Sequence, residues 1–223
     1  MEQLTWSFSL AVPDRWYVRD DDPRGSEASI ARQVEDRLAL RPDRAVAAPV
    51  LLQLLMDSWH DAEHQGAVAA ATLWEPSDDG SGAAAATLIA VMAQRAEPDD
   101  DAAEITGLLE LLGAASDFDL APRSVCTVEL RAGRAVRLRR LTRTEGAEPG
   151  EANLVVDTVQ HWVPVPGGEA ILVLVGSTPC LDVADELAAI FDAIAGTLEF
   201  GGAKRAAAPS SAGPRSSPSG PRR

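Results

Sequence analysis

Alternating apolar and polar side chains mark the beginning of the chain. The apolar positions of this segment are Leu4, Trp6, Phe8 and Leu10. A period of two predicts a strand with one buried face. Pro13 and Asp14 then predict a turn, and residues 15–18 predict a short second strand.

Four later segments have the apolar spacing of amphipathic helices. The first three are residues 26–40, 48–65 and 97–113. Gly66 is positioned to end the second helix in the left-handed conformation. The fourth helix has the most regular pattern, with one apolar face from Val183 to Leu198. Asp182 is its predicted N-cap.

The remaining apolar segments form three predicted hairpins. They pair residues 67–76 with 83–94, the two halves of 124–143, and 152–165 with 169–178. Successive hairpins favour an antiparallel sheet, so the fold class predicted is α+β, a sheet of roughly six to eight strands sandwiched by helices. The last helix is expected to pack centrally on it. No G-x-G-x-x-G or G-x-x-x-x-G-K-[ST] segment occurs, which argues against a nucleotide-binding fold.

The character of the sequence changes after Phe200. Residues 201–223 consist of Gly, Ala, Ser, Pro and basic residues without periodicity. Such a segment buries too little apolar surface to offset the entropy of ordering. We therefore predict one domain over residues 1–200 and a disordered tail over 201–223.

The net negative charge of the chain argues against two classes of binding partner. The chain of 223 residues carries a net charge of −14, and its tail holds five basic residues and no acid, so residues 1–200 carry −19. An acidic surface repels phosphate backbones and anionic lipids, so neither nucleic acid nor a membrane is an expected partner. Arginine replaces lysine almost throughout, as in GC-rich bacteria such as actinobacteria. The first residues lack the features of an export signal, and we expect a cytoplasmic protein.

Both ends of the chain carry a resemblance to a known superfamily. The opening has the pattern Phe8-x-Leu10-x-Val12-Pro13-x-x-Trp16, and the ending combines HWVPVPGGEAILVLVGSTP with ELAAIFDAIAGTL. Together they resemble the PsbP-like superfamily, which includes a photosystem oxygen-evolving subunit, a Ran-binding nuclear-import factor and bacterial lipoproteins. The resemblance implies an antiparallel sheet between helices and a scaffold that binds other proteins. It implies no shared catalytic residues.

One short motif points to a different function. His60, Glu63 and His64 form H-x-x-E-H, the zinc-binding string of inverted zinc proteases. The two histidines share a helix face, but the glutamates at the distance of a third ligand lie in a loop-like segment, residues 144–151. The motif also occupies a helix end, where free carbonyls favour protonated histidine. A solvated helix end is the favoured interpretation, ahead of adventitious metal and catalytic zinc.

A basic strand is the second candidate site. Alternation places Arg137 and Arg139 on one face, with Arg143 further along it. These arginines could form a docking stripe for a partner protein or pair with Glu129 and neighbouring carboxylates. Cys126 is expected to fill core space as a small hydrophobic residue.

No segment assembles a nucleophile, a base and oxyanion donors. The favoured hypothesis is therefore a non-catalytic adaptor that binds another protein within a bacterial complex, such as a secretion or toxin system. We expect no cofactor and no enzymatic activity. The alternative is a zinc-dependent hydrolase that uses His60, Glu63 and His64.

Overall fold

The structure is a computed structural model that describes residues 4–19, 26–39, 48–64, 66–76, 83–95, 101–114, 120, 124–144, 154–167 and 170–205. Its helices are α1 (Ser26–Ala39), α2 (Ala48–His64), α3 (Asp101–Gly113) and α4 (Ala184–Ala195). Its strands are β1 (Leu4–Ser9), β2 (Tyr17–Val18), β3 (Ala67–Pro76), β4 (Ala83–Gln94), β5 (Ser124–Leu130), β6 (Gly133–Thr144), β7 (Leu154–Pro164), β8 (Ala170–Thr178) and β9 (Glu199–Arg205).

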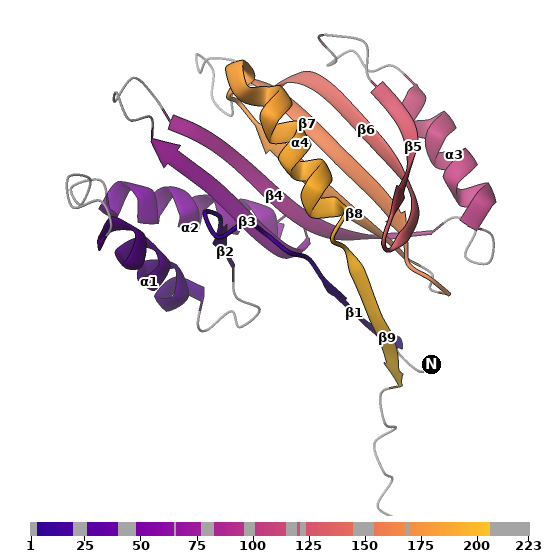
Figure 1. The fold of residues 1–223 in the computed structure, drawn as a ribbon, viewed down its shortest axis with the longest axis horizontal. Coiled ribbons are helices and arrows are strands. Elements are labelled where there is room, and N and C mark those ends of the chain that lie inside the picture. Colours follow the sequence, from indigo (N-terminus) through magenta and orange to yellow (C-terminus); the bar gives the residue numbers. More distant parts are fainter. Residues whose placement is uncertain are drawn as a thin grey trace, which may run out of the picture.

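Seven of these strands form one sheet in the order β2-β3-β4-β8-β7-β6-β5 (Figure 1). Every neighbouring pair is antiparallel, so the predicted α+β class with an antiparallel sheet is confirmed. The three predicted hairpins are β3–β4, β5–β6 and β7–β8. Strands β1 and β9 form a separate antiparallel two-stranded sheet.

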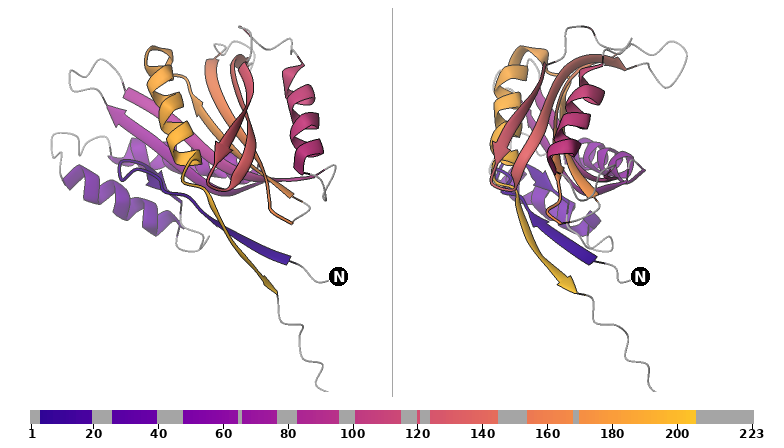
Figure 2. Two further views of the ribbon diagram at one scale, coloured as in Figure 1. Left: turned by 45° about the vertical axis from the view of Figure 1, so that its right-hand side comes forward. Right: turned by 90° about the vertical axis from the view of Figure 1, so that its right-hand side faces the viewer.

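Helices cover both faces of the large sheet (Figure 2). Alternation along β8 shows how the faces divide: Leu172 and Leu174 belong to the hydrophobic cluster of α4. Ile171 and Val173 point the opposite way, into the cluster of α3. Helices α1 and α2 cover the β3 end of that second face. None of the described helices is long and apolar enough to cross a membrane.

Helix α4 lies on the middle of the sheet, as the sequence predicted. Its stripe is buried against β7 and β8, and Phe191 is only 2% exposed. The ring of Phe191 lies directly over Gly176 of β8, where a β-carbon would collide with ring atoms. Trp16 meets the same ring edge-to-face, with the ring centroids 5.9 Å apart. The absence of a side chain at Gly176 therefore lets the helix approach the sheet this closely.

The beginning of α4 differs from the prediction. A 3₁₀ turn, Leu181–Val183, precedes the helix, and the N-cap residue is Val183, without a side-chain cap. The prediction of Asp182 as the N-cap was therefore wrong, because the extra turn moves Asp182 outside the capping position. Gly66 does follow the end of α2 with a φ of 76°, as predicted.

Strand β9 corrects the predicted start of the tail. Its residues reach Arg205 because the backbone pairs with β1, with Phe8 opposite Phe200 and Leu4 opposite Arg205. The prediction of disorder was therefore wrong for residues 201–205. The rest of the predicted tail, residues 206–223, lies outside the described residues.

Substitution of Gly176 by alanine tests the close approach of α4. We expect Gly176→Ala to lower the free energy of unfolding by about 1–3 kcal/mol, because the new β-carbon would collide with the buried ring of Phe191 and force it to shift. Gly107→Ala in α3 is the matched control. A β-carbon there meets no atom within 4 Å, so this variant should gain about 0.5–1 kcal/mol. Chemical denaturation measures both, and equal effects of the two substitutions would contradict the packing described here.

Candidate functional site

The structure contains two candidate functional sites: a charged cluster between α4 and the sheet, and an apolar pocket beside β1. In the cluster, Arg137 of β6 binds Asp192 of α4 with two hydrogen bonds, from Nε to Oδ1 (2.7 Å) and from Nη2 to Oδ2 (3.1 Å). His161 of β7 lies opposite Arg137 in the strand register. Its Nε2 is 3.0 Å from Oδ1 of the same carboxylate. Asp192 thus connects a helix with two strands.

A second ion-pair group lies at the N-terminal end of α4. Arg139 contacts Asp157 at 2.6 Å and Asp185 at 2.7 Å. The hydrogen bond with Asp157 raises the pKa of the Arg139 guanidinium above its ordinary value, against the opposing effect of burial, and Asp185 adds to the rise. Strand alternation explains the arrangement, because Arg137 and Arg139 both face α4.

The carboxyl group of Asp192 is held in its charged form. Burial alone would raise its pKa, but hydrogen bonds and charge from His161 and Arg137 outweigh burial and lower the pKa to about 2. The side chain of His161 is only 3% exposed. It is therefore enclosed and already bonded to a carboxylate, which suits a group that fixes α4 in place better than one that meets a substrate.

The predicted docking stripe is largely engaged inside the fold. The side chains of Arg137 and Arg139 are 16% and 29% exposed and bind acids of α4 and β7. Glu129 pairs instead with Arg134. Arg143 is exposed near the end of β6. Partner docking through these three arginines stays a prediction, while the contacts present in the structure are internal ion pairs.

The H-x-x-E-H segment forms the last turn of α2. His60 and His64 are exposed, and His64 Nδ1 donates to the carbonyl oxygen of His60 at 2.8 Å. Glu63 forms an ion pair with Arg19. Among the residues that the structure describes, no three His, Cys, Asp or Glu side chains form a group that could hold a metal ion. The third ligand that the zinc alternative needs is therefore not found in this part of the chain.

The two cysteines are not paired with each other. Both are free thiols; Cys126 is exposed on β5, and Cys180 is half-buried. The prediction that Cys126 fills core space was wrong because β5 is the outermost strand of the sheet.

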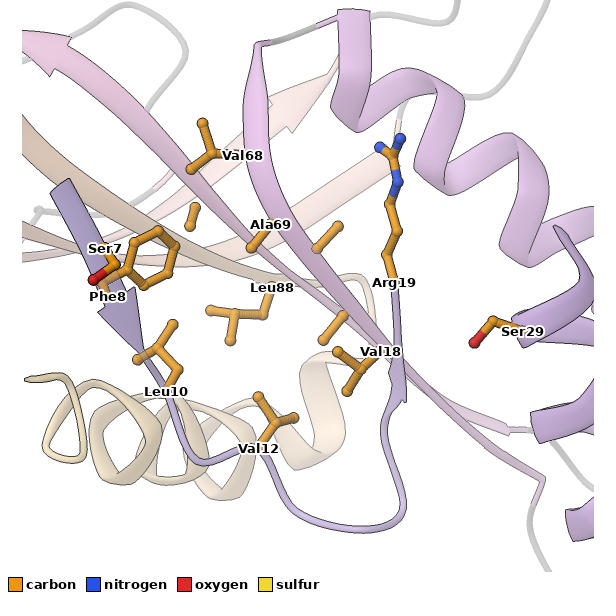
Figure 3. A pocket seen from close by; sticks show the side chains of 13 residues that line it. Ser7, Phe8, Leu10, Val12, Val18, Arg19, Ser29, Val68, Ala69 and Leu88 are labelled. Carbon is orange, nitrogen blue, oxygen red and sulfur yellow. The ribbon is translucent and has the colours of Figure 1, made fainter. Parts of the chain in front are cut away.

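The apolar pocket has a volume of about 620 Å³, within the usual range of ligand pockets. We name it the β1–β3 pocket; its lining residues are Ser7, Phe8, Leu10, Val12, Val18, Arg19, Ser29, Val68, Ala69, Ala70, Ala71, Leu88 and Ala90. Figure 3 shows Phe8, Leu10 and Val12 on the β1 side, and Val68, Ala69 and Leu88 on the sheet side. Sequence reasoning missed this pocket.

The pocket leaves large apolar side chains in contact with solvent. Val18 is 43% exposed and Val68 is 46% exposed. The alanines of β3 and β4 create the space, because their short side chains extend only a little from the sheet toward β1. The only sequence signal was this run of alanines, together with the apolar alternation that continues from Phe8 to Val12.

Comparisons with known proteins give a likeness of fold alone. No protein-family model matches the chain. A search of curated proteins finds no match either. Among solved structures, the chain is similar to LpqN, described as involved in cell envelope biogenesis of Mycobacterium tuberculosis. The identity is 14% and the TM-score 0.47, over 88% of this chain and 84% of LpqN. The resemblance to the PsbP-like superfamily stays a prediction.

Removal of the Asp192 charge tests the structural role of the cluster. At pH 7, Asp192→Asn should lower the free energy of unfolding by about 1 kcal/mol, because it leaves a mostly buried guanidinium without its carboxylate, while solvent around the 40% exposed carboxylate screens part of the interaction. Because the pKa of Asp192 in the folded protein is depressed from 3.8 to about 2, this stabilisation is complete above pH 3.8 and is lost as the pH falls through about 2.

Denaturant unfolding of the wild type and the variant between pH 7 and pH 2 measures this difference. Glu110→Gln, at an exposed site on α3, is the control and should stay within about 0.5 kcal/mol of the wild type. A difference between wild type and Asp192→Asn that grows on acidification would contradict the assignment.

Proposed function

We propose that this protein is a non-catalytic module that binds another protein through the β1–β3 pocket, as part of a bacterial complex. The observation that carries the proposal is the pocket itself: it has a volume of about 620 Å³, is lined mainly by apolar side chains and leaves Val18 and Val68 exposed. Contiguous apolar surface of this kind is typical of sites at which a partner displaces water. Association with a secretion or toxin system is one form that such a complex could take.

The proposal includes no enzymatic step and no cofactor. It is supported by the state of the polar side chains beneath α4, since Arg137, Asp192 and His161 satisfy one another. A catalytic base has to reach the proton that it abstracts, and His161 is enclosed. The cluster then serves to hold α4 against the sheet, and the binding role falls to the pocket.

The net charge of the domain supports a protein as the partner. The first 200 residues carry −19, which disfavours approach to nucleic acid and to anionic membrane surfaces. A protein with a basic contact region would be attracted instead, and such attraction mainly speeds encounter and fixes orientation.

Photo-cross-linking in the native host tests the proposal. A photoreactive phenylalanine derivative placed at Val68 should yield a discrete adduct of protein size. The same group at Leu111, which is 68% exposed on α3 and outside the pocket, is the matched control and should not. Adding Val18→Glu to the Val68 probe should reduce the adduct, because a charge in the pocket disfavours apolar docking. Equal labelling from both positions, or adducts with lipid alone, would overturn the proposal.

A further inference from the structure

We infer that the occupant of the β1–β3 pocket is an extended, basic segment of the partner protein, which adds as a β-strand along the outer edge of β3. This inference rests on the proposed function and names the chemistry of the partner's contact region. Three observations support it: the open backbone edge of β3, the apolar side chains along the pocket wall, and the negative charge of the domain.

The pocket reaches the backbone edge of β3. Successive side chains of a strand point to opposite faces, so a pocket over one face would be lined by alternate residues. Four consecutive residues, Val68 to Ala71, line this one. On the opposite side, the consecutive residues Ser7 and Phe8 of β1 also line it. Both strands therefore present their edges to the pocket.

The edge of β3 lacks a partner strand over part of its length. Strand β2 pairs only at Thr72 and Ala71, and the next bond is donated by Arg19 N to the carbonyl oxygen of Ala70. Within the described residues, no strand pairs with the outer edge over 67–69. The register against β4 also shifts at this point. An open edge is a template for another strand, and its amide and carbonyl groups can be satisfied by a polypeptide backbone.

The walls of the pocket suit alternating apolar side chains. Phe8, Leu10 and Val12 recur every second residue along one wall (Figure 3). A strand inserted beside them would place every second side chain in the same apolar space, which gives the side-chain selectivity usual in strand addition. An acyl chain could fill the apolar volume, but it has no donors or acceptors for the edge of β3. The edge therefore favours a peptide.

The negative charge of the domain indicates which residues should flank the apolar positions of the peptide. The domain is strongly acidic, with a net charge of −19 over residues 1–200. Like charges would repel an acidic segment, whereas lysine or arginine beside the apolar positions would be attracted. The expected segment thus has apolar residues at alternate positions and basic residues next to them.

Selection from a displayed library of random ten-residue peptides, with the full chain as bait, tests the inference. The selected peptides should share apolar residues at i, i+2 and i+4 together with Lys or Arg. Binding of a selected peptide should weaken at least tenfold when alternate backbone nitrogens on the pairing edge are methylated, because this removes the one or two hydrogen bonds that the peptide donates to the open edge of β3 and places a methyl group against that edge, but keeps the side chains. Exchange of its basic residues for glutamate should also weaken binding, and more so at low salt.

Variants of the protein locate the bound peptide. Val68→Asp should weaken binding at least tenfold, whereas Leu111→Asp, a change of the same chemistry outside the pocket, should leave the affinity unchanged. Circular dichroism and the melting temperature control for folding. Peptides without the alternating pattern, insensitivity to backbone methylation, or tighter binding of lauric acid at the same site would each overturn strand addition. If the Val68 cross-link to a protein persists in that case, the proposed function stands; if it is also absent, both fail.

Discussion

The contact between Phe191 and Gly176 organises the fold on which the rest of the molecule depends. Because Gly176 has no side chain, α4 settles on the central strands β7 and β8 and fills the middle of one sheet face. This position also carries Asp192 over Arg137 and His161. The β3–β4 end of the same face then lies beyond the helix (Figure 1). There, residues of β1 and the small alanine side chains of β3 and β4 line the pocket (Figure 3).

Local patterns in the sequence were sufficient for most elements. Two runs of small apolar residues, with turn residues between them, located β3 and β4, and the apolar face located α4. The pairing of β4 with β8 was not predictable, since nothing within either strand names a partner some 80 residues away. Strand β9 was missed for a similar reason: Gly201 and its neighbours show no alternation, and their order comes from pairing with β1 at the other end of the chain.

The candidate site was harder to predict than the fold. Alternation placed Arg137 and Arg139 on one face, but it could not show that α4 lies over that face with Asp192 and Asp185 as partners. The H-x-x-E-H motif was visible because its residues are adjacent, yet Glu63 pairs with Arg19. The pocket was not predicted because its residues are far apart in the sequence. Its lining comes from β1, β2, α1, β3 and β4 and consists mostly of small or apolar residues without a motif.

The structure thus separates two roles: a charged cluster that holds α4 in place, and an open strand edge beside an apolar pocket to which we assign binding. Amide hydrogen exchange of the full chain, free and saturated with a selected peptide, measures that assignment most directly. The account predicts new protection of backbone amides in β3 between Val68 and Ala70 and in β1 around Phe8, with little change in α3. Protection confined to α3 or to the Arg137–Asp192 cluster, with β3 unchanged, would contradict it.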